Sequence, residues 1–426
     1  MNNHKWIRET LQDMPVIDTH EHLETESARI ARHGDFISLY MTHYASSDVM
    51  TAGLSPEKME WLRGGQLDVR EKWAILKPYW EICRNTAYFR ALERISNDLF
   101  GIAHLDDDTF LQLNAAFLAA SRPGWYRQIL KNICHIEYCV QDDLFIADAG
   151  NISMPDPLYY RESAKYDLFL EIGGAISPAS LMGTYRRSFT SLGEYVNLLG
   201  DTVQTAKQER CIVSLKSAIA YNRTLQFDNP SLSQAEAIFD RILRGEVLTG
   251  SERKPVQDYL MHALLGLAGD LSLPFQIHTG LQEGLGGCLP DSRPANLISA
   301  FRQHPDVKFD VFHTGYPYGQ ELAAICKQFQ NVYVDMCWVH VISQEYAVRI
   351  LEEMLEMLPS NKILGFGGDY IFVEGTYAHL QFAKENIADA LSGRIDKGRL
   401  DKADAPGLAR RLLHDNAQAL FGGDES

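Results

Sequence analysis

Short apolar runs of β type alternate along this chain with longer segments whose apolar residues recur at helical spacing. Eight such runs fall at residues 15–19, 133–140, 167–172, 211–215, 274–277, 307–312, 331–336 and 362–366. Segments of helix length, such as 192–208, 319–328 and 343–357, separate the later runs. Strands that alternate with helices predict a parallel sheet, and eight units favour a closed barrel. The expected fold is therefore α/β, a (β/α)8 TIM barrel.

The first two runs are separated by about a hundred residues, far more than an ordinary loop contains. Helical apolar spacing recurs there at 36–43, 70–83, 86–97, 109–120 and 125–131. Ser55-Pro56-Glu57 is typical of a helix start, because serine caps and proline suits the first turn. We expect one domain over residues 1–426, with 24–132 as a mostly helical insertion after the first strand. Such an insertion would cover a site or form an oligomer contact.

Composition narrows the possible partners. The chain has 426 residues, 40 of them basic and 56 acidic, which gives a net charge of −16, and no Lys/Arg-rich run interrupts this balance. Phosphates and acidic lipids are not attracted to such a surface, so nucleic acid and membrane partners are not expected. The seven cysteines form no Cys-x-x-Cys pair, and the start of the chain lacks a signal-peptide core. We expect a cytoplasmic protein that acts on a small-molecule substrate, with homo-oligomerisation left open.

Metal-ligating side chains follow five of the eight runs, at the strand ends that form the active-site face of a barrel. They are His20, His22, Lys216, His278, His313 and Asp369. A single histidine at a strand end is ordinary, and a single lysine there would more often be a solvated amine. Five strands that each deliver such a residue indicate a shared site for a divalent metal, with zinc expected from the ligand types.

The sequence motifs around these residues resemble those of the amidohydrolase superfamily, in particular the amidohydrolase 2 (amidohydrolase-related) branch. Leu215-Lys216-Ser217-Ala-Ile-Ala-Tyr221-Asn-Arg223 and His313-Thr-Gly-Tyr-Pro-Tyr318 are also similar to the amidohydrolase-like domain fused to some glutamine synthetases. The resemblance spans residues 15–421 and leaves the 24–132 insertion unexplained.

That resemblance implies two metal ions, the first held by three side chains: His20, His22 and Asp369. The second is then held by His278 and His313, while Lys216, carboxylated on its amine, bridges the pair. Carboxylation is required for this role because an ammonium group has no lone pair. The open alternative is a single metal with Lys216 as a free amine, so one or two metals per chain are expected.

The function expected first is that of a metal-dependent hydrolase, which activates water at the barrel mouth to attack a small amide, lactone or ester carbonyl. Asp369 is the candidate general base, and Tyr221 and Arg223 are candidates for binding a substrate carboxylate. Two alternatives remain: a metal-dependent decarboxylase or sugar-acid isomerase, and a non-catalytic interaction domain that a metal stabilises.

Overall fold

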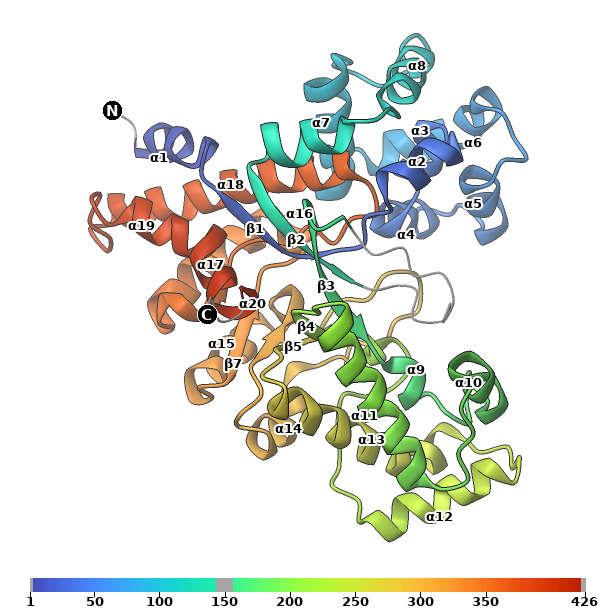
Figure 1. The fold of residues 1–426 in the computed structure, drawn as a ribbon. Helices are drawn as coiled ribbons and strands as arrows, with labels where there is room; N and C mark the ends of the chain where they lie inside the picture. The colour runs from blue at the N-terminus through green and yellow to red at the C-terminus, as the bar shows by residue number, and fades with distance from the viewer. Residues whose placement is uncertain (1–2, 143–155, 423–426) are drawn as a thin grey trace.

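The computed structural model describes residues 3–142 and 156–422, and its centre is the expected (β/α)8 barrel (Figure 1). Eight parallel strands are paired in chain order: β1 (Val16–Glu21), β2 (Ile136–Asp142), β3 (Tyr160–Lys165), β4 (Ser214–Ser217), β5 (Phe275–Ile277), β6 (Phe309–Val311), β7 (Val332–Asp335) and β8 (Ile363–Leu364). The ring closes through backbone hydrogen bonds, with Thr19 N donating to Phe366 O at 3.2 Å and Asp369 N donating to His20 O at 2.8 Å. The predicted fold class is confirmed.

Helices cover the outside of the barrel. They are α1 (Asn3–Gln12), α9 (Asp167–Leu170), α10 (Pro178–Tyr185), α11 (Leu192–Glu209), α12 (Leu232–Leu243), α13 (Gly250–Asp270), α14 (Ile298–Gln303), α15 (Gly319–Gln328), α16 (Val339–Ile342), α17 (Gln344–Met357), α18 (Val373–Asp396), α19 (Ala405–Arg410) and α20 (Asn416–Phe421). The long helix α18 packs against both α1 and α17. Across the described parts of the chain, every helix is too short or too polar to cross a lipid bilayer.

Between β1 and β2 the chain forms a helical lobe beside the barrel (Figure 1). Its elements are α2 (Glu26–Arg32), α3 (Phe36–Tyr40), α4 (His43–Thr51), α5 (Pro56–Arg63), α6 (Val69–Cys83), α7 (Ala87–Phe100), α8 (Phe110–Ala120) and the π-helix η1 (Arg127–Ile133). As its sequence indicates, Ser55 caps α5 by accepting a hydrogen bond from Lys58 N. Arg29 donates two hydrogen bonds of 2.6 Å to Glu374 and so ties the lobe to α18. The assignment of residues 24–132 to a single domain with the barrel stays a prediction.

The third strand is the part of the sheet that the apolar pattern misplaced. Residues 167–172 were expected to form it, but β3 ends at Lys165 and Asp167–Leu170 forms α9. The β3 segment contains Arg-Glu-Ser, which hides the apolar signal, yet it pairs with strands on both sides, and Glu162 is buried in an ion pair with Arg210. The correction moves the end of the third strand to Lys165.

Close packing and an unusual backbone shape the barrel where β8 meets β1. A Cβ atom on Gly368 would lie 1.8 Å from Glu21 Oε1, so only glycine allows this approach. Asp369 then has φ +56° and, at the end of β6, His313 has φ +63°. Both values lie in the left-handed region that side chains avoid, and such residues cluster at functional sites.

Candidate metal centre and substrate cavity

The six predicted metal ligands meet at the carboxyl ends of the strands. His20 lies in β1 and His22 directly follows this strand, and their Nε2 atoms lie 3.2 Å apart. Asp369 Oδ1 lies 3.1 Å from His22 Nε2 and 3.5 Å from His20 Nε2. The structure therefore brings together the first set of three that the sequence grouped.

The second pair faces the first across the cavity. His313 Nε2 and His278 Nδ1 are 3.0 Å apart. The other ring nitrogen of each histidine donates to a backbone carbonyl, His313 Nδ1 to Cys337 O at 2.9 Å and His278 Nε2 to Leu281 O at 3.1 Å. In the neutral imidazole only one nitrogen carries a proton, so the two facing nitrogens are both lone pairs. Two acceptors at this distance call for a cation between or beside them.

Lys216 lies beside His20 of the first group. Its Nζ atom is 3.2 Å from His20 Nε2 and 4.2 Å from the centre of the Phe312 ring. Burial lowers the pKa of the Lys216 amine, and Asp142 and Asp369 oppose that shift. A neutral amine is the nucleophile that carboxylation requires, so this environment suits the bridging role that the resemblance implies for Lys216.

The protonation states of the other ligands also suit a metal. Burial lowers the pKa of His20 and His278 well below the ordinary value and that of His313 to about 4. Burial alone would raise the pKa of Asp369, but its hydrogen bond to His22 and the charges of the neighbouring histidines hold the pKa well below its usual range. Neutral imidazoles and an ionised carboxylate are the ligand forms that divalent metals bind. We call these six side chains the cage.

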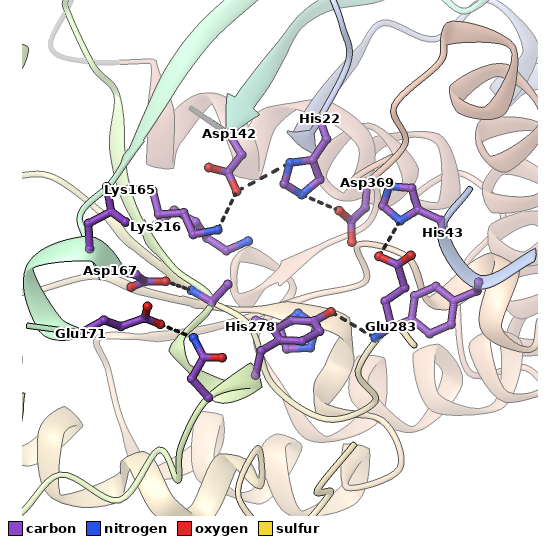
Figure 2. A pocket seen from close by; sticks show the side chains of 15 residues that line it. His22, His43, Asp142, Lys165, Asp167, Glu171, Lys216, His278, Glu283 and Asp369 are labelled. Atoms are coloured by element: carbon purple, nitrogen blue, oxygen red, sulfur yellow. Dashed lines mark hydrogen bonds and ion pairs between the residues drawn. The ribbon is translucent and has the colours of Figure 1, made fainter. Parts of the chain in front are cut away.

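A cavity of about 430 Å³ opens in front of the cage (Figure 2). Besides cage residues, four parts of the chain line it: the ends of β2 and β3 with α9, the lobe, the segment after β4 and the segment after β5. Their polar side chains there are Asp142, Lys165, Asp167, Glu171, His43, Tyr44, Tyr221, Asn222 and Glu283. The segment after β5 is held to the lobe, because Tyr44 donates to Leu281 O at 3.0 Å. The lobe therefore forms part of the cavity wall.

The two residues proposed to bind a substrate carboxylate lie in different surroundings. Tyr221 lines the cavity, and its ring centre is 4.7 Å from that of His278. The guanidinium of Arg223 instead donates to Asp258 Oδ1 at 2.7 Å and lines a neighbouring cavity. The structure does not bring Arg223 to the cage.

Several residues in or beside the cavity were missed from the sequence. Asp142 is the last residue of β2, so the rule that found the cage would have found it as well. Lys165 was hidden by the misplaced third strand. Cys337 follows β7 and lies with His313 and Asp369 in a group whose possible ligand atoms are within 4.8 Å of one another. His43 belongs to the lobe, and no sequence signal placed it near Glu283, whose Oε2 is 3.8 Å from its Nδ1.

The fold and the cage together define a class, a (β/α)8 barrel with a candidate metal centre at its strand ends. The family model described as Amidohydrolase matches residues 232–423. Protein fluG of Emericella nidulans is 27% identical over 254 residues, which are 57% of this chain and 28% of that protein, so the chain spans under a third of this relative's length. These two matches confirm the resemblance to the amidohydrolase superfamily.

Two solved structures are similar over nearly the whole chain. Uronate isomerase from Thermotoga maritima has a TM-score of 0.82 and 15% identity, with 98% of this chain and 97% of that chain covered. Glucuronate isomerase from Caulobacter crescentus has a TM-score of 0.81 and 17% identity, with coverage of 100% and 94%. At such identity the likeness shows a shared fold, and its extent means that the fold is shared beyond the barrel.

Proposed function

We propose that the protein is a metal-dependent isomerase that interconverts the aldehyde and ketone forms of a sugar acid. The observation that carries this proposal is the extent of the likeness to the uronate and glucuronate isomerases, which covers 98–100% of this chain and so includes the lobe. In this chain the lobe sets His43 and Tyr44 on the cavity wall. The proposal reverses the order expected from the sequence, where hydrolysis came first and isomerisation was an alternative.

The cage is the proposed metal site, and zinc is the proposed ion. His20, His22 and Asp369 would hold one ion. When bound there, a divalent metal supplies a Lewis acid that polarises a carbonyl oxygen and lowers the pKa of water. The lone pairs that His278 and His313 turn towards each other are the structural feature that fits a metal in the second position.

Isomerisation moves one proton from C2 to C1 and one from the C2 hydroxyl to the C1 oxygen, so atoms balance and no external oxidant is needed. Asp369 is the carboxylate that we assign to proton transfer. Its low pKa keeps it ionised at neutral pH, which is the state that accepts a proton. Lys165 is the ammonium on the opposite wall and would pair with the substrate carboxylate, because Asp142 raises its pKa against the effect of burial.

The test is a direct assay on metal-reconstituted protein. Zinc- or manganese-loaded protein is incubated with D-glucuronate and D-galacturonate, and the ketose product is followed by NMR. We expect slow but metal-dependent conversion of at least one uronate, abolished by chelation. Hydrolysis of amides or lactones without any uronate conversion would overturn the isomerase proposal.

Hydrolysis is the second candidate, and the composition of the cage favours it. The set contains Lys216 as well as both histidine pairs, which is the full complement for two metals and a bridging carboxylated lysine, and the matching family model is described as Amidohydrolase. In this reaction Asp369 would take a proton from the attacking water and pass it to the leaving group.

Metal counting decides between one and two ions. We expect two metals per chain by elemental analysis, together with intact protein heavier by one carbon dioxide at Lys216. Lys216→Met should lose that mass and one of the two ions. One metal and an unmodified lysine in the wild-type protein would defeat the binuclear proposal.

A further inference from the structure

On the side of the cavity formed by β2 and β3, one buried carboxylate has no hydrogen-bond donor. The Asp142 side chain is 1% exposed, and neither of its oxygens has a partner among the described residues. Figure 2 shows the carboxylate pointing into the cavity, beside His22 and above the two lysines. Leaving a buried ionised oxygen without hydrogen bonds is costly, so such a group indicates that a ligand supplies the donor.

The surroundings of Asp142 provide charge but no hydrogen bond. His22 Nδ1 is 3.7 Å and Lys165 Nζ is 3.9 Å from Asp142 Oδ2, both beyond hydrogen-bond distance. The ammonium group of Lys165 already faces this carboxylate, with its Nζ 3.9 Å from Asp142 Oδ2. That ammonium would repel a cationic ligand, whereas it would not repel a neutral donor. The missing partner is therefore a neutral hydrogen-bond donor such as a hydroxyl group.

The other two carboxylates of this wall, those of Asp167 and Glu171, already accept hydrogen bonds from the protein. Asp167 accepts hydrogen bonds of 2.7 Å from Ser217 Oγ and from Ala218 N. Glu171 accepts one from Asn222 Nδ2. Asp142 is thus the carboxylate of this wall that is buried with no hydrogen bond to either oxygen from the described residues.

We propose that Asp142 is a specificity residue that accepts a hydrogen bond from a neutral hydroxyl group of the substrate. This rests on the proposed function in one respect, namely that the same substrate reaches the cage. Asp142 adjoins His22, so the hydroxyl would lie close to the group held there. Analogues that lack this hydroxyl should bind poorly, because they leave Asp142 buried without a donor.

The experiment measures binding rather than turnover. D-Gluconate has the carboxylate and hydroxyl groups of a sugar acid but no aldehyde or ketone carbonyl, so it cannot isomerise. Its affinity and those of its 2-deoxy and 3-deoxy analogues are measured by calorimetry on metal-reconstituted protein. The wild-type protein should bind D-gluconate at least about tenfold more tightly than one of the deoxy analogues. Asp142→Ala should remove that difference, and Asp142→Asn, which keeps a carbonyl oxygen, should retain part of it.

Glu171→Gln is the matched control, because it removes one negative charge from the same wall at a residue whose carboxylate already has a donor. It should discriminate between the three ligands as the wild-type protein does. Thermal melting and metal analysis accompany every variant, since Asp142 also forms a possible ligand group with His20 and His22.

Three results would overturn the proposal: wild-type protein that binds the three ligands equally or binds none, an Asp142→Ala variant that still discriminates, or loss of metal from both Asp142 variants. The last result would assign the carboxylate to the metal. Failure of the isomerase proposal looks different. In that case no uronate is converted, while the binding difference and its dependence on Asp142 remain.

Discussion

The two sides of the cavity differ in how their polar side chains are hydrogen-bonded. On the cage side, His278 and His313 each donate to a backbone carbonyl and turn a lone pair towards the other at 3.0 Å. On the β2–β3 side, the charges of Asp142 and Lys165 are separated by 3.9 Å and make no hydrogen bond. The first arrangement fits an ion that stays in place, whereas the second fits a molecule that enters and leaves.

The backbone conformation also differs between the cage side and the β2–β3 side. His313 and Asp369 have left-handed φ angles, and glycine is required beside Asp369 by the contact with Glu21. Asp142 and Lys165 are the last residues of β2 and β3, which pair with each other without a register shift. Left-handed backbone therefore occurs where the cage side chains converge on one point, whereas Asp142 and Lys165 have no such conformation.

The largest effect is expected when the cage is broken. His278→Ala removes one of the two imidazoles of the proposed second metal position. His313 is then the only histidine left there. Activity should fall by about 10³-fold, as when a group that stabilises transition-state charge is lost. Elemental analysis should show a lower metal content, and steady-state kinetics give the rate.

The control for that variant is a second pair of histidines outside the cavity. His262 Nδ1 and His304 Nε2 are 2.9 Å apart, so His262→Ala removes the same side chain from a similar contact. Its activity and metal content should stay unchanged. An equal loss in both variants would show that the effect of His278→Ala is general destabilisation.

Arg223→Ala separates a structural arginine from a substrate-binding one. Arg223 is 10% exposed and pairs with Asp258, which is 1% exposed, so the change strips one partner from a buried ion pair. We expect a loss of about 3 kcal/mol in the free energy of unfolding, at the low end for such pairs because Lys254 still contacts Asp258 at 2.6 Å. Urea denaturation measures this. A raised KM with unchanged stability would instead restore the role first expected from the sequence.

These residues show how far the sequence could predict the site. The cage was predicted because each of its strands has an apolar run that ends in a conspicuous His, Lys or Asp. Lys165 was missed because β3 carries Arg-Glu-Ser inside a strand that is buried by pairing on both sides. The position of Arg223 depends on Asp258 in α13, a contact across 35 residues that no local pattern encodes. The contribution of the lobe to the cavity likewise depends on tertiary packing.

Acid should destabilise the protein through buried histidines near the end of β8. Burial lowers the pKa of His340 to about 4, and its Nε2 donates to Gly365 O at 3.0 Å. A histidine in the unfolded chain titrates at about 6.5, so the unfolded chain binds more protons than the folded chain between these two pH values. The free energy of unfolding should therefore fall by about 3 kcal/mol as pH drops from about 6.5 to about 4.

On the β2–β3 side, Asp167 should change stability with pH in the opposite direction to His340. Burial raises the pKa of Asp167, so its contribution to stability is lost as pH rises through that pKa. Urea denaturation of metal-free protein across this pH range measures the sum of the two contributions to the free energy of unfolding.

His340→Gln should reduce the loss of unfolding free energy between about pH 6.5 and about pH 4. An unchanged loss would show that His340 does not cause it.

The smallest effect is expected where the lobe supports the cage. Leu281 O accepts hydrogen bonds from both Tyr44 Oη and His278 Nε2, so Tyr44 holds the carbonyl that orients a cage histidine. Tyr44→Phe removes one hydrogen bond worth about 1 kcal/mol, which corresponds to about a fivefold change in an equilibrium constant. Metal affinity measured by chelator competition should weaken by about that factor, while the metal-free protein melts within a few degrees of the wild type. Since Tyr44 also lines the cavity, a rise in KM at full metal loading, without a change in metal affinity, would place its role on the substrate side instead.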